Sequence, residues 1–199
     1  MPEPEPSHEW KPYHHGNLRA ALLTAAEQTL RERGIGEVSL RDLARQTGVS
    51  HGAPSRHFRD RQALLDALAA VGYARLADEI AAATRKADDG FEAQLRAVAA
   101  TYVRFAVDNG ALLELMLAAG KAEGPDPAPE ASEGPYAILG QLIRHGQETG
   151  ELRPGDPERL RLIILATFQG IAALVSSRQV PPGQADALIS DATALFTRS

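Results

Sequence analysis

The stretch from Ser39 to Phe58 constrains this chain most, because it has the pattern of two short helices joined by one glycine turn. Ser39 can cap a helix that starts at Leu40, and Asp42, at the third helical position, can reach back as a shortened capping box. Gly48 is expected to end this helix, since glycine tolerates the positive φ of a sharp turn. Two capped helices at this spacing are typical of a helix-turn-helix unit that reads DNA.

The second helix of the pair is expected to follow a Ser50 cap and to run from about residue 51 to residue 58. It has almost no apolar face, so its neighbours must hold it while its other side meets a partner. Pro54 lies near the fourth helical position, where its missing N–H predicts a distorted first turn. The predicted DNA-contacting residues are Arg41, Ser50, His51, Gly52, Ala53, Ser55, Arg56, His57 and Arg61.

Within this set, Arg41, His51 and Ala53 are expected to read base edges. Arginine can bind guanine O6 and N7 with two hydrogen bonds, and the methyl group of an alanine can pack on a thymine methyl. Arg61 and His57 are expected to hold phosphates. Phosphate binding stays an alternative for Arg41, and packing inside the domain stays an equal alternative for His57.

The distribution of charge supports a nucleic-acid partner at one end of the chain. The net charge is −5, but residues 11–61 hold nine Lys and Arg against five Asp and Glu, a net charge of +4. Residues 1–10 carry −3 and the rest of the chain −6, and five of the six histidines precede residue 62. The basic potential is therefore confined to one end, while an acidic body would repel DNA elsewhere.

The other apolar patterns are helical throughout, so the predicted fold class is all-α. With the pair above, they give about nine helices, over residues 18–33, 61–86, 91–109, 112–117, 134–149, 157–177 and from 182 onward. We expect a mobile arm over residues 1–12, a three-helix DNA-binding domain over 13–60, and an effector-binding and dimerisation domain over 61–199. Residues 118–133 lack apolar periodicity, which predicts a mobile loop.

The last two predicted helices are more apolar than the core of one chain needs, so a second copy is expected to cover part of their surface. The predicted dimerisation residues are Ile164, Ile171, Leu174, Val175, Leu188, Ala192, Leu195 and Phe196.

Several of these segments together resemble the TetR-like family of transcriptional regulators. Gly48-Val-Ser, His57-Phe and Arg59-Asp-Arg-Gln-Ala-Leu-Leu65 resemble its N-terminal signature, and the likeness extends from about residue 13 to residue 68. Ser55 stands where the family usually has a tyrosine that grips a phosphate.

The second half resembles a branch of the family whose C-terminal domain carries a Trp-His-Gly (WHG) type sequence, an aromatic residue followed by His-Gly. Tyr102-Val-Arg-Phe-Ala106 and residues 112–117 resemble the fifth and sixth helices of that branch. Phe168-Gln-Gly170 falls at the aromatic-His-Gly position, with Gln169 in place of the histidine.

The resemblance implies a homodimeric transcription regulator, more a repressor than an activator, that binds an inverted-repeat DNA operator and is released by a small-molecule effector. The long helix from Arg61 is the expected transmitter between the effector and the DNA-binding end. The effector is expected to be mid-sized and partly apolar. Its predicted contacts are Tyr73, Tyr102, Phe105, Met116, Leu139, Ile143, Phe168 and Gln169.

Other classes of function find no support in the sequence. There are no cysteines, which removes disulfides, thiolate zinc sites and cysteine nucleophiles. No Gly-rich phosphate loop, nucleophile elbow or His-Glu-x-x-His occurs, so we expect no enzyme, cofactor or metal. Without a run of 18 or more apolar residues or a signal peptide, the chain is expected to be cytoplasmic, with no membrane partner. The alternative is a non-catalytic helical binding protein whose basic N-terminal end contacts RNA or an acidic protein.

Overall fold

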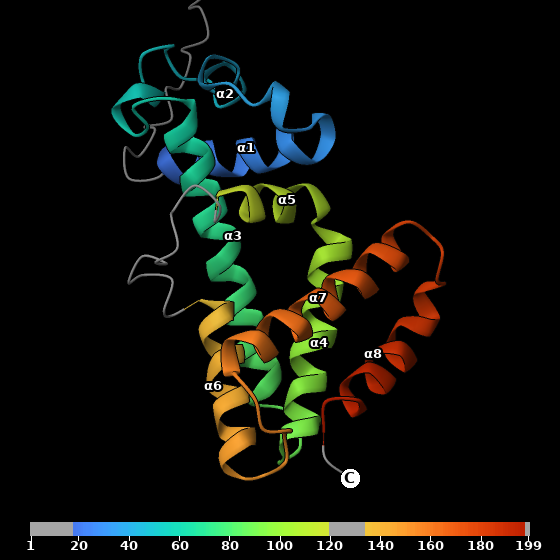
Figure 1. Ribbon diagram of the computed structural model, residues 1–199. Coiled ribbons are helices and arrows are strands. Elements are labelled where there is room, and N and C mark those ends of the chain that lie inside the picture. Colours follow the sequence, from blue (N-terminus) through green and yellow to red (C-terminus); the bar gives the residue numbers. More distant parts are fainter. Residues whose placement is uncertain (1–17, 120–133, 198–199) are drawn as a thin grey trace, which may run out of the picture.

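The computed structural model describes residues 18–119 and 134–197, and within them all regular elements are helical (Figure 1). The predicted all-α class is therefore confirmed. The predicted arm over residues 1–12 and nearly all of the loop over 118–133 lie outside the described residues. The α-helices are α1 Leu18–Arg33, α2 Leu40–Gln46, α3 Arg61–Thr84, α4 Phe91–Asp108, α5 Gly110–Ala119, α6 Pro135–Glu148, α7 Pro157–Ser176 and α8 Ala185–Ala194. Short 3-10 helices are η1 Ile35–Glu37, η2 Pro54–Arg56 and η4 Pro182–Gln184.

Side-chain caps, among them the predicted Ser39, set the starts of three of these helices. Ser39 Oγ accepts from the backbone N–H of Asp42 at 3.2 Å, Asp60 caps α3 through Ala63 N at 2.8 Å, and Asp156 caps α7. The hydroxyl of Ser39 also donates to the carboxylate of Asp42 at 2.7 Å. In a usual capping box, that carboxylate would accept from the backbone N–H of the cap residue instead. The hydrogen bond from the Ser39 hydroxyl lowers the pKa of Asp42 below its ordinary value, helped by the nearby Arg45.

The second helix of the DNA-reading pair, expected over residues 51–58 after a Ser50 cap, is not a regular α-helix, so this prediction was wrong. A turn closed by Ala53 N donating to Ser50 O at 3.0 Å leads into η2, and Phe58 N donates to Pro54 O at 3.0 Å. Pro54 has no N–H to return to the Ser50 carbonyl, so the i to i−4 ladder cannot start there. The distortion expected in the first turn therefore extends over the whole of residues 51–58. The buried ring of Pro54 holds this segment against the rest of the domain.

Two other boundaries differ from the predicted ones. α5 begins at Gly110 instead of residue 112, and α8 begins at Ala185, after the η4 turn, instead of residue 182. Pro181 and Pro182 both lack an N–H, so the chain can coil there without a regular α-helical ladder.

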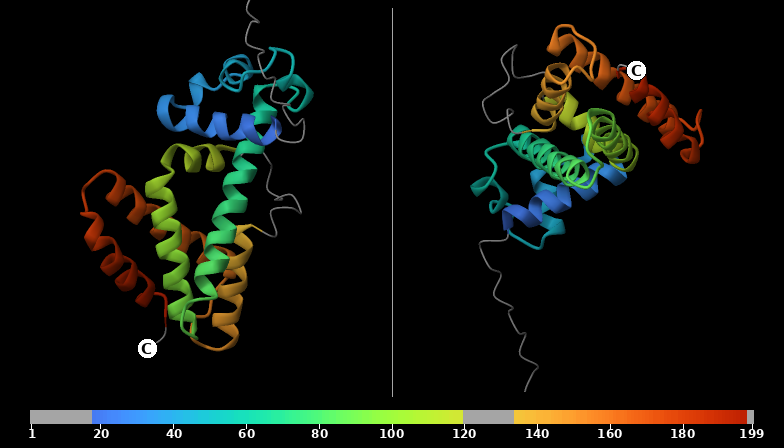
Figure 2. Two further views of the ribbon diagram at one scale, coloured as in Figure 1. Left: turned by 180° about the vertical axis from the view of Figure 1, so that it is seen from behind. Right: turned by 90° about the horizontal axis from the view of Figure 1, so that it is seen from below.

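The helix α3 is the axis of the molecule. At one end it packs against α1, and along its length it packs against α4, α5 and α6. Figures 1 and 2 show α1 and α2 at this end, α5 lying across the space beneath α1, and α7 and α8 on the outer side of α4. A single buried apolar cluster runs from Leu22 in α1 through Leu68 in α3 to Ile189 in α8. The two ends of the chain therefore share one continuous core.

The helix α7 combines a buried face with an unusually apolar exposed one. It packs on α4, α6 and α8. Among the described residues it is also the one helix whose length and composition would suffice to cross a bilayer. Only 28% of its most apolar 18-residue stretch is buried in the structure. An exposed apolar surface of this kind is typical of an interaction site.

Helix α6 depends on a glycine for its approach to α4. Gly146 is buried, and a Cβ added there would overlap the ring of Phe91, which is itself 1% exposed. Gly140, six residues earlier in the same helix, has only Arg144 Nη1 at 3.5 Å from such a Cβ.

We predict opposite effects for alanine at these two positions. Gly146→Ala should lower the free energy of unfolding by about 1–3 kcal/mol through overpacking against Phe91. Gly140→Ala should raise it by about 0.5–1 kcal/mol, because alanine loses less backbone entropy in a helix. Urea unfolding of both variants checks this. Equal changes would mean that α6 and α4 are not as close as described.

Candidate DNA-contacting surface and ligand cavity

The residues predicted to contact DNA gather at the end formed by α1, α2 and the segment over residues 50–58 (Figure 1). Eight of the nine are exposed, and Ala53 is half-buried. Arg45 and Arg59 are ion-paired with Asp42 at 2.9 Å and Asp60 at 3.2 Å. Arg41 and Arg56 make no ion pair with any described residue, so their charges face solvent.

Arg61 has a structural task that the sequence did not indicate. Its Nε donates to Val38 O at 2.8 Å, and its Nη2 donates to Ile35 O. These bonds join the first residue of α3 to the connection between α1 and α2. The phosphate contact predicted for Arg61 would have to use the remaining N–H groups of the guanidinium.

The sequence left two roles open for His57, phosphate binding and packing inside the domain, and the structure gives the packing to its neighbour Phe58. Phe58 is buried and carries the packing, with the guanidinium of Arg19 5.4 Å from its ring centroid. His57 is exposed, so it is accessible to a phosphate. Arg19, on α1, is a further exposed cation at this end that the sequence analysis missed, because helical spacing alone did not connect it with Phe58.

The other half of the molecule holds a cavity with about 20 Å³ of space for the centre of a water molecule, enough for one water. Five of the eight predicted effector contacts line it: Tyr73, Tyr102, Met116, Leu139 and Phe168. The other three do not line it: Phe105 packs under Arg75, Ile143 is fully buried and Gln169 is half-buried. Lining residues absent from the predicted set are Leu76, Ile80, Val98, Leu113, Pro135, Tyr136 and Leu165.

Two tyrosine hydroxyls of the cavity wall differ in their hydrogen bonding. Tyr73 Oη donates to the carbonyl of Met116 at 2.8 Å. Tyr102 Oη is buried and has no hydrogen-bond partner among the described residues. Burial raises the pKa of Tyr102 to about 12, and it raises the pKa of Tyr73 further. The side chain of Gln169 lies near enough to the hydroxyl of Tyr102 to oppose part of this rise, but it does not meet it with the geometry of a hydrogen bond. Both hydroxyls therefore keep their protons at neutral pH.

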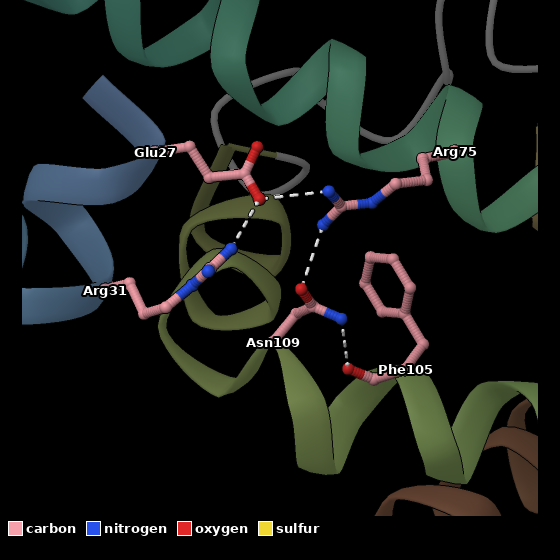
Figure 3. Close-up of polar contacts among 5 residues, drawn as sticks. All are labelled: Glu27, Arg31, Arg75, Phe105 and Asn109. Atoms are coloured by element: carbon pink, nitrogen blue, oxygen red, sulfur yellow. Dashed lines mark hydrogen bonds and ion pairs between the residues drawn. The ribbon is translucent and has the colours of Figure 1, made fainter. Parts of the chain in front are cut away.

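A polar cluster joins the DNA-contacting end to the cavity-bearing half (Figure 3). Glu27 Oε1 of α1 accepts from Arg75 Nη1 of α3 at 2.9 Å and from Arg31 Nη2 at 3.2 Å. Arg75 Nη2 donates to Asn109 Oδ1 at 3.0 Å, and its guanidinium lies 5.2 Å from the ring centroid of Phe105. We call Glu27, Arg75 and Asn109 the junction cluster. Because its members are 48 and 34 positions apart, no sequence pattern indicated it.

A groove of about 200 Å³ borders the junction cluster between α1 and the start of α5. Glu27, Leu30 and Arg31 of α1 form one wall, and residues 108–112 form the other. A water-accessible groove therefore separates part of α1 from the start of α5 at this point.

The predicted dimerisation residues fall into two groups. Ile164, Ile171 and Val175 are buried in the core of their own chain. Leu174 and Leu195 are exposed, and Leu188, Ala192 and Phe196 are half-buried. The exposed face of α7 also presents residues that the prediction did not include: Leu162, Ile163, Ala166, Gly170 and Ala173. We call these five residues with Leu174 the outer stripe of α7.

Comparison with known proteins places both halves in one family. Residues 22–68 match the model of bacterial regulatory proteins of the tetR family, and residues 95–197 match a tetracyclin repressor-like C-terminal domain. The HTH-type transcriptional regulator BetI of Cronobacter sakazakii is 35% identical over 81 residues, and the match spans 40% of each chain.

Solved structures share the whole fold. A protein of unknown function from Rhodococcus sp. RHA1 is 41% identical, with a TM-score of 0.81, and the match covers 94% of this chain and 96% of that one. The fatty acid degradation regulator FadR of Bacillus halodurans is 19% identical, with a TM-score of 0.68 over 88% of this chain and 96% of that one, which shows similarity of fold alone.

The junction cluster yields a stability prediction with a matched control, because Arg75 and Arg31 both bind the same oxygen of Glu27. Arg75→Met keeps the packing on Phe105 but removes the guanidinium, so we expect a loss of about 1–2 kcal/mol in the free energy of unfolding. The side chain of Arg31 is 65% exposed, and Arg31→Met should cost less than about 0.5 kcal/mol. Chemical denaturation measures both, and equal losses would contradict the role of Arg75.

Proposed function

The chain belongs to the TetR family of bacterial regulatory proteins, and from this premise we propose that it is a ligand-responsive, DNA-binding transcriptional regulator. It acts in the cytoplasm as a homodimeric repressor that binds an inverted-repeat operator and leaves it when a small molecule binds. The observation that carries the proposal is the match of both halves to models of this family, one half over the basic end and the other over the apolar cavity. The alternative of an RNA-binding or acidic-partner protein is not favoured by these matches.

The DNA-binding role is supported by the charge and exposure of the N-terminal end. Arg41 and Arg56 face solvent without an ion-pair partner, and Arg19 adds a third cation beside them. His51 and Ser55 lie on the exposed side of the turn that replaces the expected recognition helix. In a two-fold dimer, two such surfaces would enter successive major grooves about 34–36 Å apart, which requires an inverted repeat.

The homodimer is supported by the outer stripe of α7. Ala166, Gly170 and Ala173 are small, and a Cβ added at Gly170 would meet no atom of its own chain within 4 Å. Small residues let two helices approach closely, while Leu162, Ile163 and Leu174 supply apolar area at the edges. A two-fold contact would bury the same stripe on both copies, together with the exposed Leu195 of α8.

The effector role is supported by the position of α5. Leu113 and Met116 of α5 form part of the cavity wall, and the same helix packs against both α1 and α3. A ligand larger than one water would push this wall outward, and the groove beside the junction cluster gives α5 and α1 room to shift. The ligand changes DNA binding only as far as its affinity differs between the two arrangements.

We predict that Arg41 specifies a base. Arg41→Ala should weaken binding to the preferred duplex by about 1–3 kcal/mol and flatten the preference at one position of each half-site. Arg45→Ala is the control, because Arg45 lies on the same helix but is paired with Asp42, so it should leave the base preference unchanged.

Selection from a randomised duplex, followed by salt titration of the binding constant, measures both effects. The same base preference for wild type and Arg41→Ala, with a uniform loss of affinity, would show that Arg41 binds phosphate only. If the wild type selects no inverted repeat at any salt concentration, the proposed function itself is wrong.

The dimer contact can be tested at the centre of the outer stripe. Gly170→Asp should place a carboxylate in a desolvated contact and raise the dimer dissociation constant by at least about 100-fold, since an unpaired buried charge costs on the order of 3–5 kcal/mol. Val71→Asp is the control, because Val71 is 40% exposed but lies on α3, away from the stripe. Light scattering at micromolar concentration should report monomers for the first variant and dimers for the second. Dimers for both would exclude this face.

A further inference from the structure

The cavity between α3, α4, α5, α6 and α7 has a wall that combines aromatic rings with one unpaired polar atom. We propose that its ligand is an uncharged aromatic compound with a single hydrogen-bonding oxygen, which pairs with the hydroxyl of Tyr102. This proposal deepens the proposed function, since it takes the cavity as the effector site. It names the class of molecule that the site selects.

The hydroxyl of Tyr102 carries the argument for a polar group on the ligand. Tyr102 is 5% exposed, and its Oη is the one buried side-chain N or O atom of the described residues without a hydrogen-bond partner. Buried polar groups are nearly always satisfied, because an unmade hydrogen bond retains the full cost of desolvation. Tyr73, from the facing helix α3, shows the usual arrangement by donating to Met116 O. Gln169, whose polar side chain acts on this hydroxyl, does not reach it with hydrogen-bond geometry. A ligand oxygen beside Tyr102 would supply the missing partner.

The rings of the cavity wall carry the argument for an aromatic body. Three of the four tyrosines in the chain line the cavity, together with Phe168. The ring centroids of Tyr73 and Tyr136 are 5.9 Å apart, and those of Tyr102 and Phe168 are 6.4 Å apart. Both pairs are tilted, at 54° and 42°, so their edges and faces are presented at angles that suit a further ring.

The charge of the surroundings carries the argument for a neutral ligand. The described residues that line the cavity include no Asp, Glu, Lys, Arg or His. The cation beside it, Arg161, has its guanidinium 5.6 Å from the ring centroid of Tyr136 and is paired with Glu158 at 2.8 Å. Arg161 is therefore already paired outside the cavity, and it occupies a face of Tyr136 that a cationic ligand would need. The raised pKa of Tyr102, about 12, keeps this hydroxyl neutral as well.

The cavity must enlarge to admit even a single ring. The space for one water means that lining side chains must move to admit the ligand. Met116 is the side chain best able to do so, because a thioether chain is flexible and fills irregular gaps. It packs directly on the backbone of Gly72, where an added Cβ would lie 2.7 Å from its Sδ. A rotation of Met116 away from the cavity would press on α3 at that glycine.

The test uses three probes with the same ring and alkyl group: 4-ethylphenol, ethylbenzene and 4-ethylbenzoate. Calorimetric titration of the full-length protein at pH 7 gives their dissociation constants. We expect 4-ethylphenol to bind about tenfold more tightly than ethylbenzene, and 4-ethylbenzoate to bind at least tenfold more weakly than 4-ethylphenol. Tyr102→Phe should remove the advantage of 4-ethylphenol and leave ethylbenzene unchanged.

Tyr73→Phe is the matched control, because it also removes one hydroxyl from the cavity wall. It breaks the bond to Met116 O, so its thermal midpoint should fall, whereas that of Tyr102→Phe should stay equal or rise. Tyr73→Phe should also keep the preference for 4-ethylphenol over ethylbenzene.

Three results would overturn the proposal: the tightest binding by 4-ethylbenzoate, equal binding of 4-ethylphenol by wild type and Tyr102→Phe, or no binding of any probe at millimolar concentration. A lower midpoint for Tyr102→Phe would overturn it too, since the hydroxyl would then have a partner within the protein. Operator binding is measured separately without any probe. If it is present while the probes fail, only this inference is lost, and if the probes bind as expected while no operator is found, only the proposed function is lost.

Discussion

The burial of α3 from several sides is the constraint on which the rest of the structure depends. Its apolar residues Leu64, Leu68, Leu76 and Ile80 are at most 2% exposed, yet they are covered by different partners along the helix. The first half of α3 completes the core of the DNA-contacting end, and the second half forms a wall of the cavity. Since the same helix contributes to both ends of the core, a tilt of α3 would move both ends.

How much of this was predictable depended on whether the signal was local. Ser39, Asp60 and Asp156 mark helix starts through bonds to amides two or three residues away, so the caps could be recognised from the sequence. The conformation of the segment after Ser50 was harder to predict. Pro54 removes one N–H, but how far this disturbs the segment depends on its packing against neighbouring residues. The exposed face of α7 was not predictable for another reason: its sequence is apolar on every side and has no periodicity from which to separate inside from outside.

Contacts between distant segments were outside the reach of the sequence altogether. Only the packing of α6 against α3 brings Tyr136 to Tyr73. The junction cluster joins three helical regions through a guanidinium that binds two partners at once, which is a use of arginine that lysine cannot reproduce. Arg61, assigned to phosphate from its position in the sequence, has bonds to two backbone carbonyls whose place depends on the turn after α1.

The bonds of Arg61 have a mechanical consequence. They join the start of α3 to the connection between α1 and α2, so the DNA-contacting end is carried on the tip of a helix of 24 residues. At 1.5 Å per residue such a helix is about 36 Å long, and a tilt of about 5° about its far end would displace its tip by about 3 Å. Hydrogen bonds to base edges tolerate only a few tenths of an ångström. In the proposed mechanism, a lever of this length would convert a displacement no larger than a side-chain rotation at the cavity into the loss of register with a DNA groove.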